Sequence, residues 1–290
     1  MDVFPVATLS VPGMAEGDLT VGTLYVVGTP IGNLEDITLR ALRILEEVSL
    51  IAAEDTRRAR VLTTHYEIDT PTTSYFEGNK LTKLNVILAA LEAGDVAVIS
   101  EAGMPGLSDP GYELVQAAIE RGYHVVPIPG PTAPVTALVV SGLPTDSFLF
   151  LGYLPRRKAR RQRLLHGVAH QPFTLVAFET PHRLQAGLAD IQAVLGDRPL
   201  AICREMTKTY EEIWRGSVSM ARAHFGERQP RGEFTLVIGG AEPGEQRWDE
   251  EQVRSALRDL LAQGLRRPDA AKRVADLSGW DRREVYQLGL

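Results

Sequence analysis

The chain has 290 residues, 44% of them hydrophobic and 23% charged, with a formal net charge of −6 at pH 7. This length predicts two domains and a small extra piece. No run reaches the roughly 20 apolar residues of a bilayer-spanning helix, and the start of the chain lacks the basic and apolar stretches of a signal peptide. We therefore expect a cytoplasmic protein whose residues 1–21 form a flexible extension. Cys203 is the only cysteine, which excludes internal disulfides and cysteine-pair zinc sites.

The first half of the chain alternates between strand and helix patterns. Apolar runs predict strands at 24–27, 50–53, 72–76, 96–99 and 125–128, and helical stripes lie at 37–45, around Leu62, at 81–91 and at 112–121. This alternation predicts an α/β domain with a wound parallel sheet over residues 22–142. Four strands end in loops rich in glycine, proline or acidic residues, at Gly28, Glu54, Glu101 and Pro129. Because parallel strands end at the same edge, we expect these loops to converge on one ligand-binding rim.

The second half has the elements of another α/β domain, over residues 146–240. Strand patterns occur at 148–151, 173–178, 200–203, 211–215 and 234–238, with helices at 184–194 and 218–225. The short spacing between the later strands predicts a mixed sheet with antiparallel members. After a linker, apolar residues at 253–261, 270–277 and 285–288 predict three short helices with a turn at Gly279. Residues 247–290 therefore resemble a small helix-turn-helix-like module.

Several kinds of site are excluded by the motifs. No loop ends in Gly-Lys-Ser/Thr and none reads Gly-x-Gly-x-x-Gly, so a phosphate-gripping loop is disfavoured. His166 and His170 are four residues apart, but glycine stands where a metalloprotease needs its base, and we expect no metal site. No Gly-x-Ser-x-Gly elbow occurs and Cys203 lies in a buried-strand pattern, which argues against a nucleophilic hydrolase. Asp55 and Asp109 precede helices and are also candidate helix caps.

Two polar segments of the second domain suggest contacts with a substrate. The residues Arg204 to Lys208 bring a guanidinium, a carboxylate, a hydroxyl and an amine together, as a solvated loop or as part of a substrate site. A basic segment of six cations lies within eight residues and is either an exposed helix face or a surface for a polyanion. Six like charges with no acid among them repel one another, which favours RNA or DNA as partner. The basic segment consists of Arg156, Arg157, Lys158, Arg160, Arg161 and Arg163.

The longer loop sequences resemble those of a known family. The matching stretches are LYVVGTPIGN (24–33), AEDTR (53–57), SEAGMPGLSDPG (100–111), PIPGPTA (127–133), FETPH (178–182) and GEFTLVI (232–238). In order and spacing they are similar to the ribosomal RNA small-subunit methyltransferase I family of the tetrapyrrole-methylase-like superfamily. The resemblance implies two α/β domains with S-adenosyl-L-methionine in the cleft between them, usually in a homodimer. It also implies 2′-O-methylation of a cytidine ribose in small-subunit (16S) ribosomal RNA.

The family pattern also implies which residues bind the methyl donor, largely through backbone groups. They are Gly28, Thr29, Pro30, Gly32, Ala102, Gly103, Met104, Pro105, Asp109, Pro110, Gly111, Gly130, Thr132, Phe178, Thr180, Glu233, Phe234 and Thr235.

The reaction removes a proton from the ribose hydroxyl, for which a base or a neighbouring cation is useful. Our hypotheses for these groups are Glu205 and Lys208 from the second domain and Asp55 with Arg57 from the first. Two alternatives stay open: a tetrapyrrole or other small-molecule methyltransferase of the same superfamily, and a non-catalytic RNA-binding or ribosome-assembly protein. The first would not need the basic segment, and the second would not bind the donor.

Overall fold

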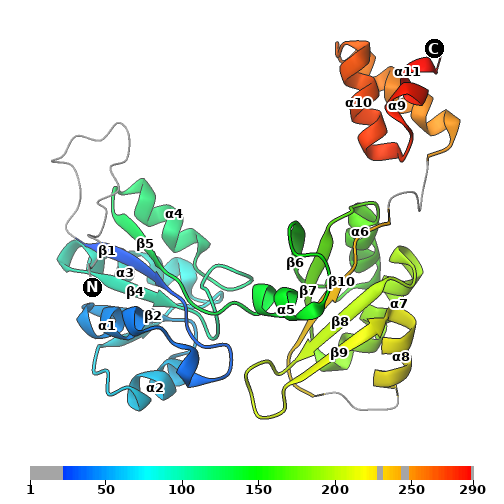
Figure 1. Cartoon of the computed structure of the whole chain (residues 1–290). Coiled ribbons are helices and arrows are strands. Elements are labelled where there is room, and N and C mark those ends of the chain that lie inside the picture. Colours follow the sequence, from blue (N-terminus) through cyan, green and yellow to red (C-terminus); the bar gives the residue numbers. More distant parts are fainter. Residues whose placement is uncertain (1–21, 227–230, 243–247, 289–290) are drawn as a thin grey trace, which may run out of the picture. The chain divides into compact units, whose positions relative to one another are not determined.

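The computed structural model describes residues 22–226, 231–242 and 248–288 (Figure 1). The predicted extension over residues 1–21 lies outside them. The chain forms two compact units that divide after Thr136, and Met206–Thr209 belong to the first unit. The division falls inside α5 (Ala133–Ser141), upstream of the boundary expected at Gly142. The sequence did not predict α5, because its apolar residues do not alternate with polar ones at a helical period.

The first unit contains the predicted parallel sheet. Its strands are β1 (Thr23–Val27), β2 (Leu50–Ala53), β3 (Thr72–Ser74), β4 (Val96–Ile99) and β5 (His124–Ile128). They lie in the order β3-β2-β4-β1-β5, and every neighbouring pair is parallel. The carboxyl ends of all five strands therefore lie at one edge of the sheet, as expected from the alternating pattern.

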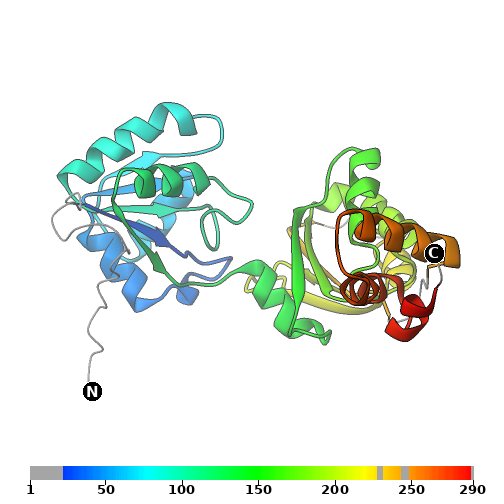
Figure 2. The same ribbon diagram turned by 90° about the horizontal axis from the view of Figure 1, so that it is seen from above.

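Helices cover both faces of this sheet (Figures 1 and 2). On one face lie α1 (Leu39–Glu47) and α2 (Thr56–His65), and on the other α3 (Lys80–Ala93) and α4 (Tyr112–Glu120). Successive residues of a strand point their side chains to opposite faces of the sheet. In β2, Ile51 packs with α1 and α2, while Ala52 packs with α3 and α4. Because both faces are covered, the strands are continuous apolar runs in the sequence.

Among the described residues, the strand β5 forms one edge of the first sheet, since its one partner there is β1. The carbonyl of Ile128 accepts a hydrogen bond from the Gly28 N–H at 3.0 Å, so the main chain of Ile128 faces β1. Successive residues of a strand direct their main-chain groups to opposite sides, so Pro127 presents its main chain outward. Proline at the free side of an edge strand has no N–H to leave unpaired.

The second unit contains the predicted mixed sheet. Its strands are β6 (Phe148–Tyr153), β7 (Thr174–Glu179), β8 (Pro199–Arg204), β9 (Glu212–Ser217) and β10 (Phe234–Ile238), in the order β6-β7-β10-β8-β9. Only β6 and β7 are parallel; the other three pairs are antiparallel. The helices α6 (Lys158–Val168), α7 (Leu184–Leu195) and α8 (Val218–Gly226) pack on one face, where Leu188, Phe225 and Leu236 belong to one core. The end of α5 lies against the other face, with Ala137 O 4.0 Å from Cys203 Sγ.

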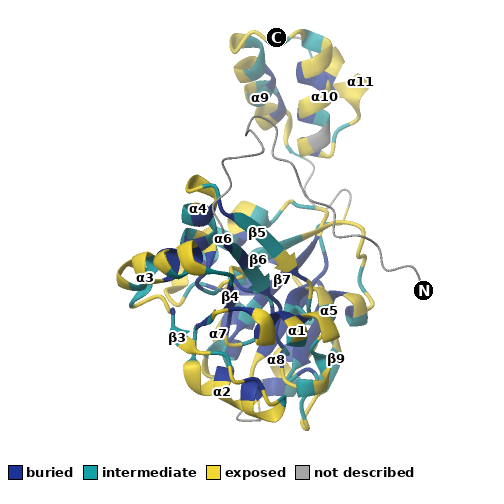
Figure 3. Cartoon of the chain, turned by 90° about the vertical axis from the view of Figure 1, so that its left-hand side faces the viewer, coloured by how far each residue is buried: buried dark blue, intermediate teal, exposed yellow. Residues whose placement is uncertain are grey.

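The C-terminal residues form the three predicted helices: α9 (Glu250–Ala262), α10 (Arg267–Ser278) and α11 (Arg282–Gln287). Their buried sides meet in a small core that includes Val253 and Val274, visible in dark blue in Figure 3. Capping boxes start α9 at Asp249 and α11 at Asp281, and Gly279 ends α10 with a φ of 68°. Within the described part of the chain, no helix is both long and apolar enough to span a membrane.

Candidate functional site

Three carboxylates lie at the rim formed by the carboxyl ends of the first sheet. Glu54 follows β2, and its Oε2 accepts a hydrogen bond from the Glu101 N–H, after β4, at 3.0 Å. Burial, followed by the neighbouring Glu54, raises the pKa of Asp109 to about 7, against the hydrogen bond from Ser100. Burial also raises the pKa of Glu54. The rim therefore combines negative charge with a carboxyl group that titrates near neutral pH.

The role expected of Asp109 as a helix cap is wrong, because α4 begins after Gly111 without any side-chain cap. Sequence reasoning also missed its titration near neutral pH. The available signal was the presence of acidic residues at two neighbouring strand ends and within the loop that follows. In the part of the chain that the structure describes, no three His, Cys, Asp or Glu side chains are grouped so that they could hold a metal ion.

The glycine-rich loops after β1, β4 and β5 meet at this rim. Thr29 and Gly103 exchange two backbone hydrogen bonds of 2.9 and 3.0 Å, which join the loops after β1 and β4. A Cβ added to Gly28 would lie 2.7 Å from both Gly130 Cα and Met104 Sδ, too close for any larger residue. Gly28 therefore lets the three loops approach one another. Pro30, Gly32, Ala102, Pro105, Pro110, Gly111 and Thr132 lie in these same loops or at their ends.

One candidate for the reaction chemistry lies beside the first of these loops. A Cβ on Gly32 would be 2.5 Å from Lys208 Cγ, and the Asn33 N–H donates to Thr207 Oγ1 at 3.0 Å. The segment Met206–Thr209 therefore contacts the loop after β1 within the first unit. This contact places the Lys208 stem at a loop expected to bind the donor, while its catalytic role stays a prediction.

Asp55 is the N-cap of α2. Its carboxylate accepts from the backbone N–H of Arg57 at 2.8 Å and from the guanidinium of the same residue at 3.1 and 2.7 Å. These hydrogen bonds hold the pKa of Asp55 well below its usual range. A carboxylate that binds protons weakly is a weak general base near neutral pH, and the catalytic role of Asp55 stays a prediction. Arg57 is engaged by Asp55 on an exposed helix end.

Glu205 supports the main chain beside it. Its Oε1 accepts from the Glu233 N–H at 2.9 Å, and its own N–H donates to Glu233 O at 3.1 Å. Its φ of 49° is in the left-handed region, which is unusual for a residue with a side chain. The catalytic role of Glu205 and the donor-binding role of Glu233 stay predictions.

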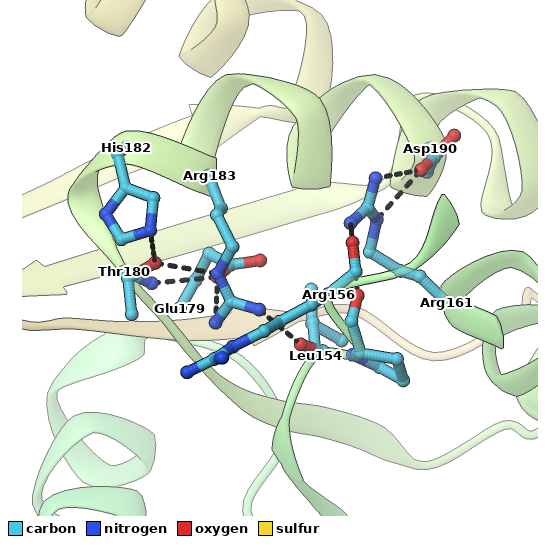
Figure 4. A network of polar contacts seen from close by, with 9 residues as sticks. Leu154, Arg156, Arg161, Glu179, Thr180, His182, Arg183 and Asp190 are labelled. Atoms are coloured by element: carbon cyan, nitrogen blue, oxygen red, sulfur yellow. Dashed lines mark hydrogen bonds and ion pairs between the residues drawn. The ribbon is translucent and has the colours of Figure 1, made fainter. Parts of the chain in front are cut away.

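A network of polar contacts surrounds Thr180 at the end of β7 (Figure 4). The Glu179 Oε1 atom accepts from the Thr180 N–H at 2.8 Å and pairs with Arg183 Nη2 at 2.8 Å. Arg183 also donates to Thr180 Oγ1 at 2.8 Å and to Leu154 O at 3.0 Å. Burial raises the pKa of Glu179 although these groups favour its charged form. The loop that begins with Thr180 is thereby fixed to the end of β6.

Three other residues of the second unit that we expect to bind the methyl donor lie in different surroundings. The Phe178 ring lies against the Phe150 and Tyr153 rings, with centroids 5.1 and 5.2 Å apart. Thr235 is buried opposite Phe178 in the ladder between β10 and β7. Phe234 is only 2% exposed and packs in the core beneath the helices, so its side chain cannot line a site. Any contact of Phe234 with a ligand is limited to its main chain.

Five of the six cations of the basic segment are exposed, and the sixth is not. Arg161 is 4% exposed, and its Nε and Nη2 donate to Asp190 Oδ2 at 2.8 and 2.5 Å. The expectation that Arg161 contacts RNA is therefore wrong: its charge is neutralised inside the unit. The partner lies 29 residues away on α7, so no local sequence pattern indicates the pair. Arg156, Arg157, Lys158, Arg160 and Arg163 remain at the surface.

Comparisons with known proteins agree with these features. Residues 23–221 match the model of the tetrapyrrole (corrin/porphyrin) methylases, and residues 248–290 match the RsmI C-terminal HTH domain. A ribosomal RNA small subunit methyltransferase I of Synechocystis is 47% identical over 273 residues, which cover 93% of this chain and 98% of that protein. A protein of the same name from Thermotoga maritima is 49% identical over 223 residues, covering 77% of this chain and all of the relative.

Solved structures show the same fold. A uroporphyrin-III-C-methyltransferase from Thermus thermophilus is similar with a TM-score of 0.54 and 25% identity, over 75% of this chain and 94% of that one. A cobalt precorrin-4 methyltransferase is similar with a TM-score of 0.59 and 16% identity, over the same shares. The first matched region spans the first sheet and four of the five strands of the second, and the other spans the C-terminal helices. The chain belongs to the ribosomal RNA small subunit methyltransferase I family, within the tetrapyrrole methylases.

Proposed function

We propose that this protein transfers a methyl group from S-adenosyl-L-methionine to the 2′-oxygen of a cytidine ribose in small-subunit ribosomal RNA. The observation that carries the proposal is the identity of 40–49% with relatives named ribosomal RNA small subunit methyltransferase I. The C-terminal helices strengthen it, since they match a domain described for that family and not only for the wider superfamily.

The rim of the first sheet fits the methyl donor chemically. When bound, the donor supplies a methyl group already activated by a positively charged sulfonium. Glu54 and Asp109 supply negative charge to such a cation, whereas the Glu101 carboxylate pairs with Arg58 at 3.3 Å. No loop of the rim has a phosphate-binding motif. The close approach of Gly28 and Gly130 brings the backbones of two loops together at the rim, where we propose that backbone groups bind the donor's polar atoms. The donor-binding residues named from the family pattern are part of this proposal.

The protein's own residues must orient the ribose hydroxyl and assist the loss of its proton. Orienting the reacting atoms can alone supply several kcal/mol of the barrier reduction. The candidates for accepting the proton or for supplying a stabilising positive charge are Glu205 and Lys208, and Asp55 with Arg57. Their replacement by alanine should lower the single-turnover rate at saturating donor. A variant that binds the donor normally and whose chemical rate is unchanged is not catalytic.

The exposed cations of the basic segment are proposed to bind the RNA backbone. Arg156, Arg157, Lys158, Arg160 and Arg163 form no ion pair with any described residue, so their charges are available to phosphates. As further parts of the proposal, the protein acts as a homodimer, and the reaction takes place in the cytoplasm, where its ribosomal substrate is found.

The decisive experiment is methylation of small ribosomal subunits isolated from cells that lack the enzyme, followed by mapping of the modified ribose. One new 2′-O-methylcytidine in the small-subunit RNA is the expected result. Calorimetric titration with S-adenosyl-L-methionine separates the rival functions. A non-catalytic RNA-binding protein would not bind the donor at high micromolar concentration, and a tetrapyrrole enzyme would bind the donor but leave the RNA unmodified.

A further inference from the structure

Two neighbouring cavities lie along the basic segment and share Arg160. The first, of about 370 Å³, is lined by Pro155, Arg156, Arg157 and Arg160. The second, of about 500 Å³, is lined by Arg160, Arg163, Leu164, Gly167 and Val168. The first is lined largely by guanidinium groups, whereas the second has an apolar floor. Their chemistry therefore differs, although one side chain joins them.

The first cavity has the charge of an anion site. Arg156, Arg157 and Arg160 bring three permanent positive charges to it, and no carboxylate lines it. The cavity lies at the start of α6, whose N-cap residue Arg157 makes no side-chain capping bond. The first N–H groups of this helix therefore add to the positive potential. Guanidinium groups match the paired oxygens of a phosphate.

The main chain beneath the first cavity is fixed by a buried network. Arg161 Nη1 donates to Pro155 O at 3.1 Å and to Arg156 O at 3.4 Å, while its Nε and Nη2 bind Asp190 (Figure 4). Arg183 holds the preceding carbonyl, that of Leu154. Three successive carbonyls are thus held by guanidinium groups that point inward. As Figure 4 shows, the Arg156 side chain extends away from Arg161. The main chain that carries Arg156 at the edge of the cavity is therefore held in place from the inside.

The second cavity has the chemistry of a surface for a flat, apolar group. Leu164, Gly167 and Val168 lie on one side of α6, and the Arg160 and Arg163 side chains line the same cavity. A Cβ on Gly167 would meet no atom within 4 Å, so the glycine opens the surface. Unpaired RNA bases stack on the planes of guanidinium groups and on apolar side chains.

We propose that the two cavities form one binding site for a single unpaired nucleotide of the RNA, with its phosphate in the first cavity and its base in the second. The inference rests on the proposed function, which supplies the RNA. Charge complementarity favours a nucleotide over a protein helix as the occupant, because each cavity is lined by cations that have no acidic partner among the described residues.

Binding of a fluorescent ten-nucleotide single-stranded RNA, and of a hairpin duplex of the same RNA, tests the site across a series of salt concentrations. Arg160→Gln should reduce the slope of log K against log salt by about 0.7, the value for one contact to a single strand. Arg121→Gln removes an exposed cation at the end of α4 that lines neither cavity and is no part of the basic segment, and it should change the slope by less than half as much. Equal slopes for the two variants would overturn the phosphate assignment.

The base cavity is tested without a change in charge. Gly167→Phe, and Gly167→Leu as a better helix former, should lower the affinity for the single strand about five- to tenfold, since stacked bases contribute substantially to binding. The salt slope and the affinity for the duplex should not change. Thermal melting verifies that both variants are folded. Unchanged single-strand affinity, or a change only in the oligomeric state, would overturn the inference while RNA methylation by the wild type would still support the proposed function.

Discussion

The Oε2 oxygen of Glu179 lies against the backbone of Gly187 in α7, where an added Cβ would be only 2.9 Å from it. The other oxygen of this carboxylate is bonded to Thr180 and Arg183, so the side chain cannot turn away without breaking those contacts. The buried carboxylate and the helix therefore fit together only because residue 187 is glycine.

Gly187→Ala should lower the free energy of unfolding, although alanine is the better helix former. The methyl group would displace Glu179 and strain its bonds to Thr180 and Arg183. Gly167→Ala is the matched control in α6, since its new methyl group meets nothing within 4 Å; it should raise stability by up to about 0.5 kcal/mol. Urea unfolding of both variants tests this, and equal shifts in the two would contradict the steric explanation.

Asp190→Asn should lower the free energy of unfolding by about 3 kcal/mol, because it leaves the buried Arg161 guanidinium without its countercharge. The double variant Arg161→Met with Asp190→Leu should lower the free energy of unfolding by less than the sum of the decreases caused by Arg161→Met alone and Asp190→Leu alone. The reason is that the double variant buries no unpaired charge. A double-mutant cycle in urea measures this coupling. Simple additivity would show that the ion pair contributes nothing beyond its separate side chains.

Donor affinity should rise with pH between about 6 and 8, because Asp109, with its pKa near 7, becomes charged in this range and attracts the cationic donor. By linkage, donor binding should also lower the pKa of Asp109. Asp109→Asn should weaken binding at pH 8 and remove most of the pH dependence, as measured by titration calorimetry. Asp146→Asn, an exposed residue of the second unit, controls for the general effect of charge removal.

The raised pKa of Asp109 also makes the stability of the folded protein depend on pH. In the folded protein Asp109 keeps its proton at pH values where the unfolded chain has lost it. The protonated carboxyl group therefore makes its full contribution to the free energy of unfolding below about pH 4, and this contribution is lost as the pH rises toward 7. Asp109→Asn should therefore stabilise the protein at pH 8 more than at pH 5. Thermal melting at both pH values measures the difference, and the opposite order would contradict the assigned burial.

Cys203 should react slowly with thiol reagents in the folded protein. Its side chain is buried, and burial raises the pKa of the thiol to about 11, so the reactive thiolate is scarce at pH 8. Labelling with a chromogenic disulfide should become fast only in denaturant. Rapid labelling of the native protein would mean that the face of β8 opens on the time scale of the assay.

Most of the fold was predictable because its signals are local. The runs that became β2 and β4 are apolar throughout, which is the pattern of strands covered on both faces, and the glycine loops mark where those strands end. The polar contacts were less predictable, because they depend on partners distant in sequence. In the sequence Arg161 looks like one more exposed cation. In the structure it is buried, because the fold brings Asp190 to it.

The pKa values of the carboxyl groups at the rim could likewise not be predicted from the sequence. The sequence indicates acidic residues at strand ends, but the raised pKa of Asp109 requires burial and the proximity of Glu54, which depend on how the loops fold. Asp55 shows the converse: a capping bond and the Arg57 guanidinium, both local, hold the pKa of its carboxyl group well below the usual range. Candidate donor residues could thus be listed from sequence, whereas their proton affinities could not.

The outward main chain of Pro127 has a consequence for behaviour at high concentration. An exposed edge strand can recruit a strand from another molecule through its free N–H groups, which is how sheets extend into aggregates. Pro127, the fourth of the five residues of β5, removes one of the outward donors that such an addition would use. The edge of the first sheet therefore resists intermolecular β-pairing without needing a partner or a covering helix.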